Sequence, residues 1–175
     1  MFIIRNRRDQ SSIIHHPSSI IHHPSSIIRH PPHITAGVTK IRLTGGEPLV
    51  RKEFPEIASR IGALKSPSQS PTGRHLLNYG ITTNGILLSR HLRDVIDSGI
   101  NIVNVSLDTL KSDRFEKIAR RNGLYRVVSA LDDTLRALVA TVKVNCVVMD
   151  GVNDDEIFDF VDMGRNRLID IRFDG

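Results

Sequence analysis

The stretch V-T-K-I-R-L-T-G-G-E-P-L-V-R, residues 38–51, decides the predicted fold. In its first half apolar and charged side chains fall on opposite parities, which predicts a strand with one buried face. Gly45 and Gly46 then allow a sharp turn in which backbone N–H and C=O groups approach a ligand closely. Glu47 adds a carboxylate, and the proline after it ends the strand. Such a turn suits an ammonium or amine group.

Four further strands are predicted beyond this one, and helical patterns separate them. The candidate strands are Thr39–Thr44, Tyr79–Thr83, Ile102–Leu107, Val142–Val148 and Asp170–Phe173. The candidate helices are Glu53–Leu64, Arg90–Asp97, Lys111–Ala119, Tyr125–Val139 and a last helix that begins with an Asn153/Glu156 capping box and buries Ile157, Phe160 and Val161. Strands that alternate with helices predict a parallel α/β architecture.

Each candidate strand has one apolar and one polar parity, whereas strands buried on both faces are apolar throughout. One face is therefore expected to pack on helices and the other to face a shared polar space, as in a barrel or part of one. The polar parity gathers Arg42, Lys143 and Arg172, whose donors suit phosphate groups. Alternatively, these side chains extend to solvent or pair with Asp108 and Asp170.

Composition sets broad limits on the function. The chain has 175 residues, enough for one core, and a formal net charge of +5. The basic balance favours an anionic ligand over nucleic acid, because no basic helix or aromatic platform accompanies the charge. A single cysteine excludes an internal disulfide framework, and Cys146, between valines, is expected to be buried and inert. No apolar run is long enough for a membrane partner to be expected.

Residues 11–31 are a heptapeptide repeat, S-S-I-I-H-H-P twice and then S-S-I-I-R-H-P. Regular prolines interrupt any helix, so residues 1–33 are predicted to be a disordered low-complexity segment and residues 34–175 the folded domain. Alternatively, the repeat is a mistranslated upstream segment, or its imidazoles bind divalent metal ions adventitiously. The arginines of residues 1–8 weakly resemble the start of a mitochondrial transit peptide.

Six blocks in order carry a family resemblance. They are I-R-L-T-G-G-E-P-L-V-R at 41–51, T-T-N-G at 82–85, N-V-S-L-D-T-L at 104–110, V-K-V-N-C-V-V-M at 142–149, G-V-N-D-D-E-I at 151–157 and I-R-F at 171–173. They resemble the GTP 3′,8-cyclases of molybdenum cofactor biosynthesis, the protein A type, which are radical S-adenosylmethionine (SAM) enzymes. The resemblance runs from Ile34 to the last residue.

The resemblance implies a partial (β/α) TIM-type barrel of the radical SAM kind and a lyase of the first step of molybdopterin biosynthesis. The substrate would be GTP and the product (8S)-3′,8-cyclo-7,8-dihydroguanosine 5′-triphosphate, with SAM and a [4Fe–4S] cluster as cofactors. The implied SAM contacts are Gly45, Gly46, Glu47 and Ser106. The implied GTP contacts are Arg42, Thr82, Lys143 and Arg172. No catalytic residue is assigned.

Two family features are missing from the sequence: the C-x3-C-x2-C cluster motif expected before Val38, and the C-terminal region with its second cysteine cluster. The chain is therefore expected to be inactive as written, with no metal ligands assigned. The family implies a reductant for the cluster and a downstream cyclic pyranopterin monophosphate synthase-type enzyme as partners. The expected location is the mitochondrial matrix in a eukaryote and otherwise the cytoplasm. A non-catalytic SAM- or nucleotide-binding remnant and a histidine-rich metal-binding protein remain alternatives.

Overall fold

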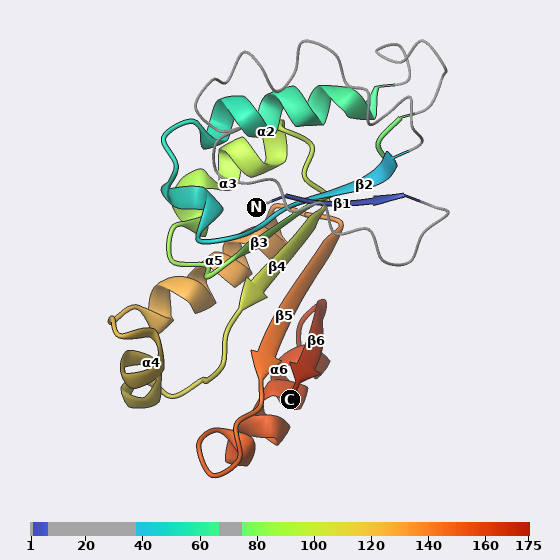
Figure 1. The fold of residues 1–175 in the computed structure, drawn as a ribbon. Coiled ribbons are helices and arrows are strands. Elements are labelled where there is room, and N and C mark those ends of the chain that lie inside the picture. Colours follow the sequence, from blue (N-terminus) through green and yellow to red (C-terminus); the bar gives the residue numbers. More distant parts are fainter. Residues whose placement is uncertain (1, 7–37, 67–74) are drawn as a thin grey trace. The chain divides into compact units, whose positions relative to one another are not determined.

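The computed structural model describes residues 2–6, 38–66 and 75–175, which form an α/β protein (Figure 1). The chain divides into two compact units. Unit 1 comprises Met1–Thr82 and Arg93–Asn101, and unit 2 comprises Thr83–Leu92 and Ile102–Gly175. The histidine repeat and the predicted domain boundary at residue 33 lie outside the described residues.

Unit 1 is built on three strands in the order β1-β2-β3. They are β1 (Phe2–Asn6), β2 (Val38–Leu43) and β3 (Asn78–Thr83). β2 and β3 are parallel, and Arg42 pairs with Gly80. β1 is antiparallel to β2, from Phe2 opposite Leu43 to Asn6 opposite Val38. The sequence did not predict β1, and its pairing gives β2 a second hydrogen-bonded neighbour besides β3.

The rest of unit 1 supplies helices that cover the apolar parity of β2 and β3. These elements are the 3-10 turns η2 (Pro48–Val50) and η3 (Ala63–Lys65), α2 (Phe54–Gly62) and the last part of α3 (Leu88–Asp97). Fully buried Tyr79 on β3 donates its hydroxyl hydrogen bond to the Ala58 carbonyl of α2, over 3.1 Å. Burial raises the pKa of Tyr79 far above its ordinary value. Gly62 ends α2 where a Cβ atom would lie only 1.9 Å from the Ser98 carbonyl oxygen, so α2 packs closely there.

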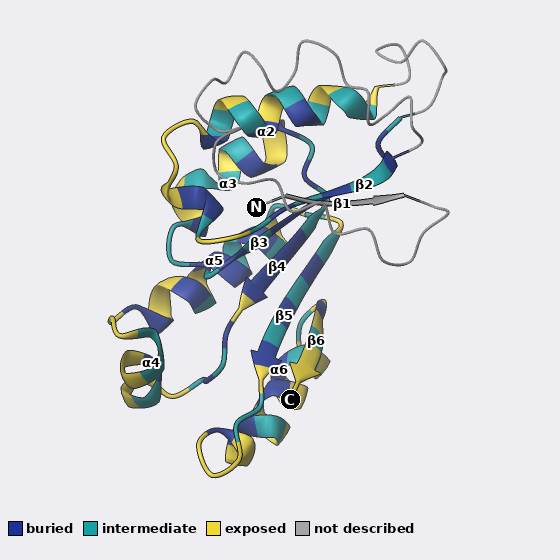
Figure 2. Ribbon diagram, viewed as in Figure 1, coloured by how far each residue is buried: buried dark blue, intermediate teal, exposed yellow. Residues whose placement is uncertain are grey.

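Unit 2 is built on three parallel strands in the order β4-β5-β6. They are β4 (Ile102–Ser106), β5 (Thr141–Val147) and β6 (Ile169–Asp174). The apolar parity of β4 and β5 joins the core, where Val103, Val105, Val142 and Val144 are at most 2% exposed. On β6 only Ile169 is buried, and most of that strand is exposed (Figure 2). As the sequence predicted, valine and isoleucine fill one face of these strands.

The helices of unit 2 are the first part of α3, α4 (Ser112–Ala119), α5 (Leu124–Arg136) and α6 (Ile157–Arg165), preceded by the 3-10 turn η5 (Asp154–Glu156). α5 packs on β5, and α6 packs on β6. Phe160 and Met163 are the buried residues of α6, so the prediction that Val161 joins its buried face was wrong. The α6 sequence places Phe160 and Met163 three residues apart, on one helical face.

The predicted capping box of this last helix was also wrong. Asn153 makes no side-chain cap hydrogen bond, and neither does Glu156 at the start of α6. Both side chains bind the loop that follows β4 instead. Apart from β1, the α/β alternation and the parallel strand pairing were predicted correctly, with strand ends within two residues of those observed.

Candidate functional site

The turn after β2 has the backbone geometry that its glycines predicted. Gly45 and Gly46 have φ angles of 94° and 54°, in the left-handed region that side chains with a Cβ rarely adopt. A Cβ atom at Gly46 would meet nothing within 4 Å, so the conformation and not crowding requires glycine there. Glu47 begins the next turn, and its Oε1 atom accepts a hydrogen bond from the Leu49 N–H at 3.1 Å. The carboxylate is thereby held beside an exposed stretch of backbone.

Arg42 and Thr82 lie on one face of the strands of unit 1. Arg42 pairs with Gly80 in the register, and Thr82 is two residues further along β3. The opposite face carries Ile41 and Ile81, which are buried. Both candidate GTP contacts of unit 1 are partly exposed, and β2, which carries Arg42, leads into the Gly45–Glu47 turn.

The polar face of unit 2 carries the other three candidates. The register of β4, β5 and β6 forms one row of Asn104, Lys143 and Asp170, and a second row of Ser106, Asn145 and Arg172. Cross-strand neighbours in one row share a face of the sheet. Ser106, Lys143 and Arg172 are therefore brought to one face within this unit, while Val105, Val144 and Ile171 occupy the other.

Lys143 forms an ion pair with Asp170 on this face. The ammonium nitrogen lies 2.5 Å from Asp170 Oδ2, and the lysine side chain is 14% exposed while the aspartate is 62% exposed. The hydrogen bond from Lys143 holds the pKa of Asp170 below its ordinary value. This is one of the pairings that the sequence left open. An anion that binds Lys143 must therefore compete with a carboxylate already in place.

Asn145 also lies on this polar face, although it is not among the site residues predicted from the sequence. It lies between Ser106 and Arg172 in the second row. Its Oδ1 atom is buried and accepts no hydrogen bond from any other described residue. A buried acceptor without a donor is costly, and because this oxygen has almost no exposed surface, a ligand could reach it only if neighbouring side chains moved. The alternation along β5 indicates on which face of the sheet Asn145 lies. Its neighbours Ser106 and Arg172 follow only from the register of β4, β5 and β6.

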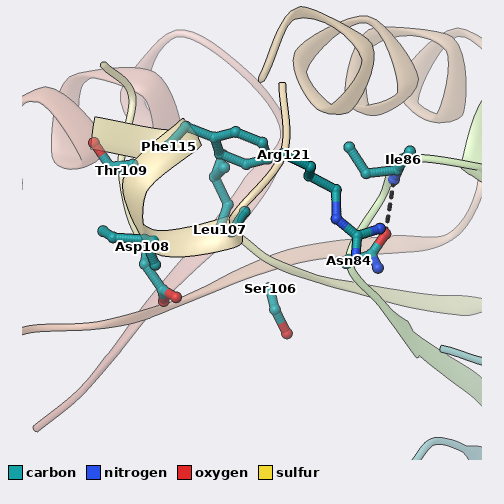
Figure 3. A pocket seen from close by; sticks show the side chains of 10 residues that line it. Asn84, Ile86, Ser106, Leu107, Asp108, Thr109, Phe115 and Arg121 are labelled. Carbon is teal, nitrogen blue, oxygen red and sulfur yellow. Dashed lines mark hydrogen bonds between the residues drawn. The ribbon is translucent and has the colours of Figure 1, made fainter. Parts of the chain in front are cut away.

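A pocket of about 240 Å³ opens beside Ser106 within unit 2 (Figure 3). Its apolar lining comes from Ile86, from Leu107 directly after β4 and from α4, and five polar side chains complete the lining. The lining residues are Asn84, Ile86, Ser106, Leu107, Asp108, Thr109, Phe115, Ile118, Ala119 and Arg121. An apolar slot with a guanidinium and a carboxylate beside it can hold a planar ring that carries polar substituents.

Cys146, the only cysteine of the chain, lies in the core of unit 2 as the sequence predicted. It is 1% exposed, and burial, with smaller contributions from Asp108 and Glu156, raises the pKa of its thiol to about 11. Such a thiol is protonated at neutral pH and is a poor metal ligand. Over residues 2–6, 38–66 and 75–175, no three His, Cys, Asp or Glu side chains are grouped to hold a metal ion.

Of the helices within the described ranges, none combines the length and apolar character needed to cross a bilayer.

Comparison with known proteins identifies relatives over most of this chain. The model of the "Radical SAM superfamily" matches residues 27–164. "Molybdenum cofactor biosynthesis protein 1" of Dictyostelium discoideum is 49% identical over 140 residues, which are 80% of this chain and 21% of that protein. "GTP 3',8-cyclase, mitochondrial" of Arabidopsis thaliana is 46% identical over 80% of this chain and 34% of its own length. "GTP 3',8-cyclase" of Clostridium acetobutylicum is 39% identical over 80% of this chain and 41% of its own length. The aligned region thus spans between about a fifth and two fifths of these relatives.

Proposed function

Because the chain belongs to the radical SAM superfamily, we propose that it is a GTP 3′,8-cyclase-type protein of molybdenum cofactor biosynthesis. The observation that carries the proposal is the identity of 39% to 49% over 140 residues to relatives named for that activity or pathway. The α/β elements then belong to the partial (β/α) barrel of the superfamily. The proposed reaction converts GTP to (8S)-3′,8-cyclo-7,8-dihydroguanosine 5′-triphosphate.

The geometry of each unit supports SAM as a ligand. In unit 1, the exposed backbone of Gly45 and Gly46 and the fixed carboxylate of Glu47 suit the methionyl amine. In unit 2, Ser106 is exposed at the end of β4, where its hydroxyl can hydrogen bond with a ribose hydroxyl. When bound, SAM would supply the 5′-carbon–sulfur bond whose reductive cleavage starts the family's chemistry. The residues of this chain bind and orient it.

GTP is the proposed substrate, and its contacts are drawn from strand positions on the polar faces. In unit 1 these are Arg42 and Thr82, and in unit 2 Lys143 and Arg172. A guanidinium presents forked donors to phosphate oxygens, and an ammonium adds a compact charge. The role proposed for these residues, considered within each unit, is to donate hydrogen bonds to phosphate oxygens.

The residues of this chain do not fit a [4Fe–4S] cluster. Such a cluster needs several thiolates, and the chain has one cysteine, which is buried with a raised pKa. We therefore propose that these 175 residues alone do not cleave SAM. The same observation favours a second candidate function, a non-catalytic protein that binds SAM or a nucleotide.

The proposed pathway also implies partners and a location. The product would pass to a cyclic pyranopterin monophosphate synthase-type enzyme, and an active cyclase needs a reductant for its cluster. One relative is named as mitochondrial, which supports the mitochondrial matrix as the location in a eukaryote.

Calorimetric titration of the purified chain with GTP and with SAM tests the ligand assignments. Arg42→Ala should weaken GTP binding about tenfold or more, because a charge-assisted hydrogen bond is lost. The matched control is Arg165→Ala, since the Arg165 side chain is 73% exposed and forms a surface ion pair with Asp162. ATP and inorganic tripolyphosphate serve as competitors that separate recognition of the base from recognition of the phosphates. A folded chain that binds neither GTP nor SAM would contradict the proposal.

A further inference from the structure

The loop that follows β4, residues 107–111, is held by a short segment that follows β5, residues 153–156. We call residues 153–156 the clamp. Asn153, which is 2% exposed, donates hydrogen bonds from Nδ2 to the Asp108 carbonyl at 2.6 Å and to the Val147 carbonyl at 2.9 Å. Its Oδ1 atom accepts from the Met149 N–H at 2.6 Å. The first residue of the clamp thus joins the loop to the end of β5.

The last residue of the clamp, Glu156, is a fully buried carboxylate. Oε1 accepts from the Thr109 hydroxyl at 2.6 Å, and Oε2 accepts from the Leu110 N–H at 2.6 Å. Arg114 of α4 also donates to Oε1. These donors all come from residues 109–114, and none comes from the helix that Glu156 precedes. A carboxylate without water is tolerated only with this degree of pairing.

The loop that the clamp holds is also a wall of the pocket beside Ser106. Leu107, Asp108 and Thr109 line that pocket directly after Ser106 at the end of β4 (Figure 3). In (β/α) folds, ligands bind at the carboxyl ends of the strands, where such loops begin. The Thr109 hydroxyl donates to Glu156 and also accepts from the Lys111 N–H at 3.1 Å, so it fixes the turn of the loop. The position of this wall therefore depends on the Glu156 carboxylate.

We propose that Glu156 is a positioning residue for ligand binding. Its buried charge holds residues 107–111 in the conformation that shapes the pocket wall and presents Ser106 to the ribose of SAM. This rests on the proposed function, which makes Ser106 a SAM contact. Stability alone does not account for the network, because apolar side chains of the same volume often stabilise a fold as well as a buried ion pair does.

The test compares Glu156→Gln with Asp155→Asn in the full chain. Glu156→Gln keeps the shape of the side chain but removes the negative charge to which Thr109, Leu110 and Arg114 donate hydrogen bonds. Asp155→Asn is the matched control, because Asp155 contacts Arg114 and Lys111 at the surface but neither Thr109 nor Leu110. The measurements are the SAM dissociation constant well below Tm, Tm itself, and amide hydrogen exchange of Leu110.

We expect Glu156→Gln to weaken SAM binding about tenfold and to speed Leu110 exchange by a similar or larger factor, since a hydrogen bond to a charged acceptor is weakened. Asp155→Asn should change both by less than about twofold. A lower Tm in Glu156→Gln with unchanged SAM affinity would overturn the positioning role and leave only a stabilising one. If Glu156→Gln does not fold, Thr109→Val removes one donor at constant volume and must weaken SAM binding, or the proposal fails.

A wild-type chain that binds no SAM would count against the proposed function and not by itself against the clamp. In that case, amide hydrogen exchange of Leu110 tests whether Glu156 holds the loop of residues 107–111. Faster exchange in Glu156→Gln than in Asp155→Asn supports control of the loop by Glu156, and equal exchange in the two variants overturns it.

Discussion

At the scale of single residues, the ion pair of Lys143 and Asp170 gives the clearest prediction about GTP. A triphosphate that binds Lys143 must displace or share the Asp170 carboxylate, which lies 2.5 Å from the ammonium. Asp170→Asn removes that competition and should strengthen GTP binding by about two- to tenfold, since Asp170 is largely exposed and its pair is screened by solvent. Calorimetry at low and at moderate salt measures the change, which should be larger at low salt.

The control for this prediction is Asp162→Asn, which removes the same charge from an exposed pair with Arg165 on α6. It should leave GTP affinity nearly unchanged beyond the general effect of net charge. If Asp170→Asn binds GTP no more tightly than Asp162→Asn does, Lys143 is not a phosphate contact.

Two glycines of unit 1 should respond differently to alanine. Gly46 needs its left-handed φ of 54° but has open space around it, so Gly46→Ala should cost about 1 kcal/mol. Gly62 has an ordinary helical φ, but its Cβ atom would lie 1.9 Å from the Ser98 carbonyl oxygen. Backbone must move to admit it, and Gly62→Ala should cost about 3 kcal/mol or more. Urea unfolding of both variants gives the two free energies, and a larger loss at Gly46 would contradict this account.

At the scale of elements, strands were the most predictable part of the fold. Their ends agree because alternation set the faces and glycine or proline marked the stops. β1 was not predicted, because its pairing with β2 is a tertiary contact that a short apolar run does not encode. The capping box failed for a related reason. Asn153 and Glu156 have the spacing of a cap, yet the loop after β4 offers their side chains stronger partners than the helix does.

The candidate site was only partly predictable for the same reason. Parity along one strand places Ser106, Lys143 and Arg172 on polar positions, and the register of unit 2 puts them on one face. The partners of these residues come from neighbouring strands. The pairing of Lys143 with Asp170 and the position of Asn145 beside Ser106 do not follow from alternation. Both depend on the register between neighbouring strands.

The attachment of α4 should depend on pH through Asp155. Hydrogen bonds from Arg114 and then Lys111 lower the pKa of Asp155 to about 2, from an ordinary value of about 3.9. The folded chain therefore favours the ionised carboxylate. The stability that this pair provides is fully present above about pH 4 and is lost as the pH falls toward 2.

Asp155→Asn should remove this part of the acid sensitivity. Tm measured from pH 5 to pH 2 should fall more steeply for the wild type than for Asp155→Asn, and the two curves should converge at the acid end. Parallel curves would show that the Asp155 contacts are too screened by solvent to affect stability.

At the scale of the whole molecule, the single cysteine leads to different predictions for ligand binding and for SAM cleavage. The match to the superfamily covers residues 27–164, and the one cysteine inside it points into the core of unit 2, where its Sγ atom lies 3.8 Å from the Asp108 carbonyl oxygen. Binding of SAM or GTP uses backbone, hydroxyl and charged groups, all of which the described residues contain. Reductive cleavage needs thiolates as well, so binding and cleavage should be separable in this chain.

Anaerobic iron–sulfur reconstitution of the 175-residue chain tests that separation. A [4Fe–4S] cluster would give about four irons per chain, and we expect far less. We also expect no 5′-deoxyadenosine to form when SAM and dithionite are added. Cys146→Ser should leave any residual iron unchanged, because a buried thiol with a pKa near 11 is not available as a ligand. Deletion of residues 11–31 shows whether residual iron is held by the histidine repeat. About four irons together with 5′-deoxyadenosine formation would contradict the prediction, and loss of both on that deletion would assign the missing ligands to imidazoles.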